Sequence, residues 1–147
     1  MQVVWKVALV AALFGCGDKD ETEVMDDTAV VTTSTTEPTE PPRDVDHLQV
    51  QAIMDANCGP CHLDGNIEAG LTLSNVLSLI ARPASQSGLR LVEPGDSSRS
   101  YLLFKLRGEQ VLGGGSGQQM PRDSQPLSDY EIETIAVWID EGCTIAE

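Results

Sequence analysis

From residue 47 onward, apolar residues recur at the three- and four-residue spacing of amphipathic helices. The stretch HLQVQAIMDANC, residues 47–58, places its apolar side chains on one helical face. The clearest pattern is PLSDYEIETIAVWIDEG, residues 126–142, in which Ser128 and Glu131 form a capping box and Gly142 can end the helix. The predicted buried face of this last helix consists of Ile132, Ile135, Ala136 and Ile139. Each stretch therefore predicts a helix with one buried face.

Two shorter helices are predicted between these two. LSNVLSLIARP, residues 73–83, has Ser74 as a candidate N-cap and stops before its proline. EPGDSSRSYLLFKLRG, residues 93–108, opens with a Pro-Gly turn and offers Asp96 as the N-cap of a leucine-rich helix. No stretch shows convincing strand alternation. The sequence therefore predicts an all-α domain over residues 46–147, with about four helices joined by glycine-bearing loops.

The amino terminus, MQVVWKVALVAALFGC, has the layout of a secretory signal. A lysine precedes an apolar run that is too short to span a bilayer comfortably as a mature helix. Leu13-Phe14-Gly15-Cys16 resembles the lipobox of bacterial lipoproteins, which implies a signal peptide over 1–15 and acylation of Cys16. Such lipidation would hold the protein on a membrane. An ordinary signal peptide with an accidental cysteine and a retained anchor are the alternatives.

The segment after the lipobox predicts both a location and a tether. Gly17 rather than aspartate follows Cys16, and by resemblance to lipoprotein sorting signals this favours the outer membrane. We expect the protein in the bacterial cell envelope, with its domain in the periplasm or at the cell surface. Residues 16–45 are rich in Thr, Glu, Asp and Pro and lack an apolar period, which predicts a disordered, extended tether.

The charge of the chain excludes one class of partner. The 147 residues include 23 acidic and nine basic side chains, for a formal net charge of −14. Nucleic-acid binding is disfavoured, because it needs clustered cations to replace counterions. Residues 18–46 carry ten of the acids and two of the bases, so much of the charge belongs to the tether and solvates it.

The stretch NCGPCHLDG, residues 57–65, contains two overlapping motifs. Cys-Gly-Pro-Cys is typical of a thioredoxin-like dithiol, whereas Cys58-x-x-Cys61-His62 is typical of c-type haem attachment. A bare metal site is a third alternative. An amphipathic helix precedes Cys58 and no parallel-strand run of Val and Ile follows it, which favours haem c over a dithiol enzyme.

Met120 is the candidate for the second axial ligand of a haem iron. It lies 58 residues beyond His62, in a glycine-rich loop just ahead of the last helix. Glycines give that loop the backbone freedom to fold over a flat macrocycle, and a thioether ligand raises the potential of the iron. Met54 is expected to pack instead. An exposed loop methionine at 120, or His47 as the ligand, are the alternatives.

Several motifs together resemble one family. CGPCH, GLTLS, VEPGDSSRSYLLFKLRG and MPRDSQPLSDYEIETIAVWIDEG resemble the cytochrome c domains common in planctomycete and myxobacterial secreted and lipoprotein chains. The resemblance covers roughly residues 47–143. It implies a mono-haem, class I-like cytochrome c fold around one haem bound covalently through Cys58 and Cys61. It also implies His62 as the proximal ligand, Met120 as the distal ligand and terminal helices that cross beside the haem edge.

The sequence departs from the resemblance at one point and leaves one cysteine over. Small class I cytochromes usually carry a proline after CxxCH whose carbonyl orients the proximal imidazole. EAGLTL, residues 68–73, has none, so another carbonyl must accept that hydrogen bond. Cys143 is expected to be an inert free thiol, with an intermolecular disulfide as the alternative. Trp138 is expected in the core, and Lys105 and Arg107 on the solvated surface rather than at a haem propionate.

These expectations describe an electron-transfer protein rather than an enzyme. The acidic charge predicts a redox partner with a basic docking face. Dissociation of Met120 would open the iron and favour a peroxidase or a small-gas-binding protein, which is the first alternative. A structural or interaction module whose haem only stabilises a small core is the second.

Overall fold

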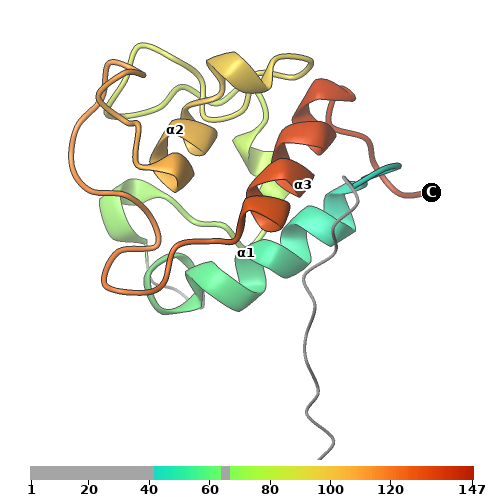
Figure 1. Ribbon diagram of the computed structural model, residues 1–147, viewed down its shortest axis with the longest axis horizontal. Helices are drawn as coiled ribbons and strands as arrows, with labels where there is room; N and C mark the ends of the chain where they lie inside the picture. Colours follow the sequence, from blue (N-terminus) through green and yellow to red (C-terminus); the bar gives the residue numbers. More distant parts are fainter. Residues whose placement is uncertain (1–41, 64–66) are drawn as a thin grey trace, which may run out of the picture. The chain divides into compact units, whose positions relative to one another are not determined.

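The computed structural model describes residues 42–63 and 67–147. The predicted signal peptide, Cys16 and most of the tether predicted over 16–45 lie outside the described residues. Figure 1 shows the three α-helices of the described part, α1 (His47–His62), α2 (Tyr101–Arg107) and α3 (Asp129–Asp140). The same described residues also form three short 3-10 helices, η1 (Glu68–Gly70), η2 (Val76–Leu79) and η3 (Ser97–Arg99).

The prediction of an all-α domain is confirmed for residues 42–63 and 67–147. This part contains no β-strand, only three isolated β-bridges. It contains three α-helices rather than about four, because the segment after Ser74 forms only the 3-10 helix η2. The N-cap of η2 is Asn75 and not Ser74, since the Asn75 side chain accepts a hydrogen bond from the Leu77 N–H.

Helix α1 begins at a capping box that the apolar pattern did not reveal. The Asp46 carboxylate accepts hydrogen bonds from the N–H groups of Leu48 (2.8 Å) and Gln49 (3.1 Å). The Gln49 side chain accepts one in return from the Asp46 N–H at 2.8 Å. The helix continues past Cys58 to His62, so its last turns contain the whole CxxCH motif.

Gln51 attaches the segment after Leu73 to α1. From α1, its Oε1 accepts a hydrogen bond from the Val76 N–H at 2.7 Å, and its Nε2 donates to the Leu73 carbonyl at 2.9 Å. Further along, the Ala81 N–H donates to the Val92 carbonyl at 2.9 Å. A helix that continued past Leu79 would use the Ala81 N–H internally, so the bond of this group to Val92 competes with such a helix. The Val76 N–H lies in the first turn and needs an outside partner in either case.

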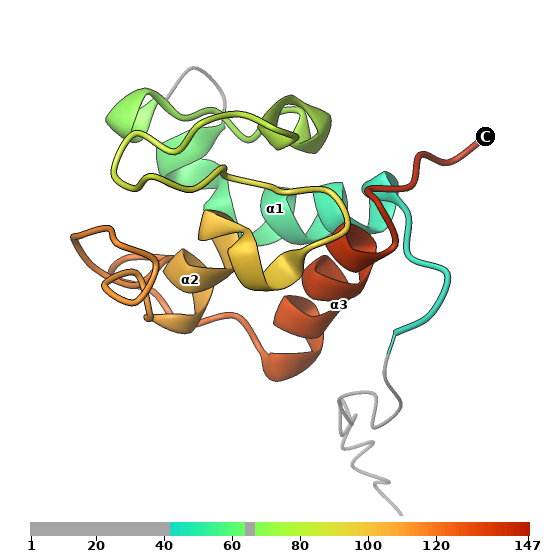
Figure 2. The same ribbon diagram turned by 90° about the horizontal axis from the view of Figure 1, so that it is seen from above.

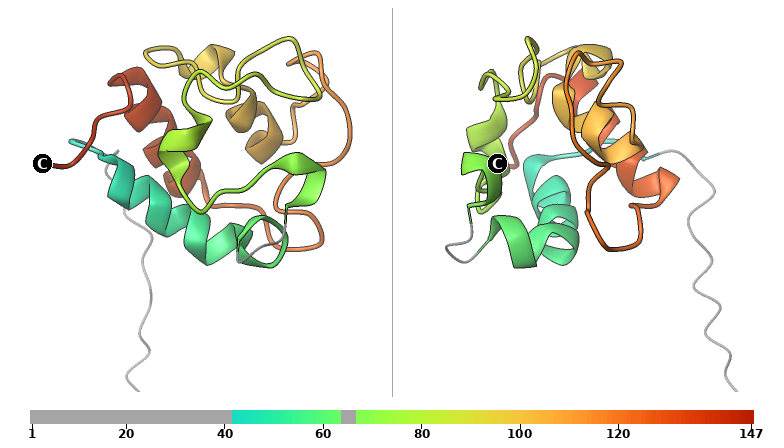
Figure 3. Two further views of the ribbon diagram at one scale, coloured as in Figure 1. Left: turned by 180° about the vertical axis from the view of Figure 1, so that it is seen from behind. Right: turned by 90° about the vertical axis from the view of Figure 1, so that its left-hand side faces the viewer.

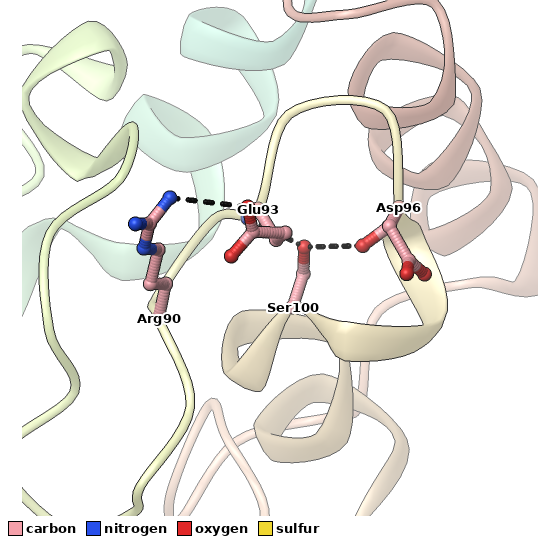
Figure 4. Close-up of polar contacts among 4 residues, drawn as sticks. All are labelled: Arg90, Glu93, Asp96 and Ser100. Carbon is pink, nitrogen blue, oxygen red and sulfur yellow. Dashed lines mark hydrogen bonds and ion pairs between the residues drawn. The ribbon is translucent and has the colours of Figure 1, made fainter.

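Ser100 delays the start of α2 to Tyr101. Its side chain is fully buried, accepts a hydrogen bond from the Glu93 N–H at 2.9 Å and donates to the Asp96 carbonyl at 3.0 Å. Figure 4 shows this turn, with Arg90 paired to Glu93 at 3.1 Å beside it. The predicted helix start at Asp96 is therefore wrong, because Asp96 precedes only η3 and makes no side-chain cap bond.

Helix α3 agrees with its prediction. Ser128 and Glu131 form the expected capping box, and the predicted apolar face is buried. Near the start of α3, the Glu131 carboxylate accepts a hydrogen bond at 3.1 Å from the side chain of Asn57, late in α1. The two helices pack against each other in opposite directions, as Figures 1 and 2 show.

A set of hydrogen bonds, here called the terminal clasp, joins both ends of the described domain. The Thr144 carbonyl accepts from the His47 N–H at 3.1 Å and from the Trp138 indole N–H at 3.0 Å. The Thr144 hydroxyl donates to the Val45 carbonyl. Figure 3 shows the start of α1 beside the carboxy-terminal segment. Because Val45 is 1% exposed, the folded part begins before the predicted boundary at Asp46.

The core lies between α1, α2, α3 and η2. Its largest fully buried side chain is Trp138, which confirms the expected core position of this residue. The other side chains below 2% exposure are Met54, Leu79, Leu103, Ile135, Ile139, Val45, Val50, Val76, Val92 and Ser100. Within residues 42–63 and 67–147, no helix combines the length and apolar character that crossing a bilayer requires.

Candidate functional site

A cavity of about 410 Å³ opens between segments that lie far apart in the sequence. On one side are the end of α1 and the segment 68–73, and on the other are α2 and residues 117–124. Figure 2 shows the segment after α1 at the upper left of the view and the loop after α2 below it. The cavity lining includes all four residues predicted to hold a haem, Cys58, Cys61, His62 and Met120.

The imidazole of His62 has a backbone partner. Its Nδ1 lies 2.9 Å from the Leu71 carbonyl oxygen, which can only accept a hydrogen bond. Nδ1 therefore carries the proton, and Nε2 keeps a free lone pair. The Leu73 N–H donates to the His62 carbonyl at 2.9 Å, so the same segment holds His62 at its backbone as well. Leu71 supplies the carbonyl that the missing proline left without a candidate.

The two cysteines of the motif are free thiols in the last turns of α1. Burial raises the pKa of Cys58 from 9.0 to about 11, and the negative charges of Asp55, Cys61 and Glu131 add to the shift. A catalytic dithiol needs a lowered thiol pKa, which helix N-termini and neighbouring cations provide. A helix carboxy terminus and nearby carboxylates have the opposite effect. The surroundings of Cys58 therefore disfavour the dithiol alternative.

Met54 lies one helical turn before Cys58 and is fully buried. The Cys58 thiol approaches its sulfur at 3.8 Å. Although Met54 also lines the cavity, its side chain belongs to the hydrophobic core, in agreement with the packing role expected for it.

The loop that carries Met120 is bound to α2. The Met120 N–H donates to the Lys105 carbonyl at 2.9 Å. The Lys105 ammonium donates in turn to the carbonyls of Ser116 (3.2 Å) and Gln118 (2.8 Å). Met120 is half-buried and packs against the core. These contacts disfavour the alternative of an exposed loop methionine.

Two glycines of this loop are needed for a reason other than backbone freedom. A Cβ at Gly115 would lie 2.0 Å from the Tyr101 hydroxyl oxygen, and one at Gly113 would lie 2.9 Å from Phe104 Cγ. The loop therefore contacts the aromatic side chains of α2 so closely that no larger residue fits at either position without displacing them.

The three remaining candidate residues, His47, Arg107 and Lys105, differ in whether they line the cavity. His47 does not line the cavity, and its Nδ1 accepts a hydrogen bond from the Ala146 N–H at 3.1 Å at the opposite end of α1 from His62. Its candidacy as an axial ligand is therefore disfavoured. Arg107 is exposed, as expected. Lys105 is half-buried and lines the cavity, and partial burial lowers the pKa of its ammonium group, so the solvated role expected for it holds only in part.

Sequence reasoning missed three residues around the site. Leu71 acts through its carbonyl, which every residue has, so no residue type could mark it. Asn57 precedes Cys58, and its side chain donates to the Ile53 carbonyl at 2.9 Å and to Glu131, which ties the motif to α3. Arg82 lines the cavity and contacts the segment that holds Leu71. Of these three residues, only Asn57 is marked in the sequence, because it directly precedes the CxxCH motif.

A bare metal site finds no support in the described residues. Among residues 42–63 and 67–147, no three His, Cys, Asp or Glu side chains form a group that could hold a metal ion. The cavity instead offers two thiols, one imidazole and one thioether. This donor set suits a group that brings its own metal and is attached through the thiols.

Cys143 is buried, with an exposed fraction of 6%. Burial raises the pKa of this thiol from 9.0 to about 11, which lowers the thiolate fraction at neutral pH about 100-fold. We expect native protein to resist a thiol-specific reagent near pH 7.5 and unfolded protein to react at once. Because the folded pKa is raised, the contribution of Cys143 to stability is lost as the pH rises from 9 towards 11.

A Cys143→Ala variant is the control for this labelling, since it removes the only thiol of the domain outside the CxxCH motif. Rapid labelling of the native chain would contradict the prediction. So would a dimer that survives denaturing electrophoresis and disappears on reduction, which would indicate the intermolecular disulfide.

Three comparisons with known proteins give the site no precedent. Neither protein-family models, nor curated protein sequences, nor solved structures match this chain. The resemblance of its motifs to cytochrome c domains therefore stays a prediction.

Proposed function

We propose that this chain is a lipid-anchored, mono-haem c-type cytochrome with a cytochrome c fold that carries out one-electron transfer. The observation that supports this most strongly is the cavity, because Cys58, Cys61, His62 and Met120 all line it although Met120 lies 58 residues beyond His62. Chance spacing of a CxxCH motif would not bring a methionine from a separate loop to the same cavity.

The residues around the cavity fit a covalently bound haem. Cys58 and Cys61 would form the thioethers, and His62 follows directly as the proximal ligand. Large apolar side chains exclude water from much of the lining: Leu71, Leu73, Leu91, Leu102 and Leu106. When bound, a haem supplies a one-electron couple between ferric and ferrous iron.

His62 and Met120 would act in opposite directions on that couple. Donation from His62 Nδ1 to the Leu71 carbonyl makes Nε2 more basic, which would favour the ferric state. The Met120 thioether is soft and would favour the ferrous state. Both side chains are half-buried, which would limit the access of water to a metal held between them.

The rest of the proposal concerns location and partners. A lipid on Cys16 would attach the chain to a membrane of the bacterial cell envelope, with the outer membrane favoured, and residues 17–45 would separate the domain from it. The net charge of −14 supports a redox partner with a basic docking face.

Visible spectra of the full chain, produced in cells with a cytochrome c maturation system, test this function. We expect sharp bands in the dithionite-reduced protein that persist after denaturation and acid-acetone extraction, because the haem is covalent. The double variant Cys58→Ser, Cys61→Ser is expected to lose all haem that resists acid-acetone extraction. The matched cysteine variant Cys143→Ala is expected to keep it. Wild-type protein without covalent haem would contradict the proposal and lead to a titration of the dithiol.

A further inference from the structure

The carbonyl that orients His62 follows an exposed turn with little packing of its own. Glu68, Ala69 and Gly70 are all exposed, and they precede Leu71 directly. Ala69 and Gly70 both have left-handed backbone, with φ of 54° and 73°. Two backbone hydrogen bonds close the turn, from the Gly70 N–H to Ile67 at 3.1 Å and from the Leu71 N–H to Glu68 at 3.0 Å. An alanine in this conformation is strained, so contacts from elsewhere help the turn to keep its geometry.

Arg82 provides such a contact. Its Nη2 donates a hydrogen bond of 2.9 Å to the Gly70 carbonyl. The backbone of Arg82 is itself held, because its N–H donates to Leu79 at 3.2 Å and its carbonyl accepts from Leu91 at 2.7 Å. The guanidinium therefore reaches the turn from a backbone that is held in place. Its planar set of donors fixes the direction of the hydrogen bond to Gly70.

The Gly70 carbonyl and the Leu71 carbonyl are only one residue apart. Fixing the first also fixes the peptide plane between the two residues, which leaves only the dihedrals of Leu71 to set the direction of the second. The Leu71 carbonyl then accepts from His62 Nδ1 at 2.9 Å. A continuous set of contacts thus runs from Arg82 through the turn to the imidazole.

We propose that Arg82 is a positioning residue for His62 and acts on it through the carbonyls of Gly70 and Leu71. Arg82 lines the same cavity but works from outside the motif, 20 residues beyond His62. Its significance for the iron ligand rests on the proposed haem-binding function, whereas its effect on the His62 ring belongs to the protein alone.

The test measures the ring proton of His62 rather than electron transfer. In the reduced, diamagnetic holoprotein, exchange of the Nδ1 proton with solvent is followed by NMR. In Arg82→Gln the side chain is too short to reach Gly70, and we expect roughly tenfold faster exchange, the effect of losing about one hydrogen bond. Exchange of the α3 backbone amides is expected to stay at the wild-type rate, which shows that the change is local.

Arg90→Gln is the matched control. Arg90 lies on the same stretch of chain, pairs with Glu93 on the surface and does not line the cavity (Figure 4). We expect wild-type exchange of the His62 ring proton in this variant. If Arg82→Gln exchanges no faster than Arg90→Gln in a protein that carries covalent haem, the positioning role is overturned while the proposed function stands.

If no covalent haem forms, the proposed function fails and the positioning role is tested in the haem-free protein. There the nitrogen chemical shifts of His62 report the fraction of the ring protonated at Nδ1. A smaller fraction in Arg82→Gln than in Arg90→Gln would support the role, and equal fractions would overturn it.

Discussion

A Met120→Ala variant is expected to keep its covalent haem and to lose the weak far-red band of the oxidised protein. The haem would stay because the proposed attachment uses Cys58 and Cys61 and not Met120, although all three line the cavity. The band is lost because alanine carries no sulfur to bind the iron. We also expect a lower midpoint potential, since a thioether ligand favours the ferrous state. Visible spectra and a redox titration measure both effects.

The control for this variant is Met54→Leu, which removes the other methionine sulfur of the described domain and keeps nearly the same volume in the core. It is expected to retain the far-red band. A band that survives in Met120→Ala, or that disappears in Met54→Leu, would contradict the assignment of the distal ligand.

The same variant distinguishes electron transfer from the peroxidase and gas-binding alternatives. If Met120 binds the iron and leaves no position for another ligand, reduced wild-type protein should bind carbon monoxide poorly. Reduced Met120→Ala should bind it readily. Equal binding by both proteins would indicate that the iron is already open, which favours the alternatives. The exposed side chain of Arg122 is paired with Asp123 at 3.3 Å and offers weak support for peroxide chemistry.

A Trp138→Ala variant is expected to lower the free energy of unfolding by about 3–5 kcal/mol. Trp138 is fully buried, and its indole N–H donates to the Thr144 carbonyl in the terminal clasp. Alanine leaves a cavity in the centre of the core and removes that bond. Since small domains are stable by only about 5–15 kcal/mol, the loss is a large share of the total. Denaturant unfolding followed by circular dichroism measures it.

Trp138→Phe keeps an aromatic ring in the core but loses the indole N–H and the volume of the five-membered ring. We expect it to cost less than the alanine variant, with about 0.5–1.5 kcal/mol of the loss due to the missing hydrogen bond, because the Thr144 carbonyl keeps its bond from the His47 N–H. An alanine variant as stable as the wild type would show that the core does not depend on this side chain.

The parts of the fold that the sequence predicted well depend on neighbouring residues. The capping box of Ser128 and Glu131 joins residues three positions apart, so its signal is complete within one stretch of chain. The boundaries that were wrong depend on distant partners. Gln51 reaches from α1 to Val76, and Ser100 binds Glu93 and Asp96 to form a turn where a helix was expected.

The candidate site divides in the same way. Cys58, Cys61 and His62 are recognisable because haem attachment requires those residue types at that spacing, and Met120 follows by elimination among few methionines. The role of the Leu71 carbonyl depends on where the chain returns after α1, which its residue type does not encode. The sequence shows that the loop before Met120 is rich in glycine, but the packing of Gly113 and Gly115 against Tyr101 and Phe104 is a tertiary property.

The terminal clasp also determines where mechanical load enters the domain. A pull on the chain before Val45 is opposed by the hydrogen bond between Val45 and Thr144. Thr144 is bonded in turn to His47 and Trp138. Force is therefore shared between both ends of the fold and its largest core side chain, and it acts at the opposite end of α1 from His62, about 22 Å along the helix. Thermal motion of the chain before Val45 would therefore act on the terminal clasp and not on the residues that line the cavity.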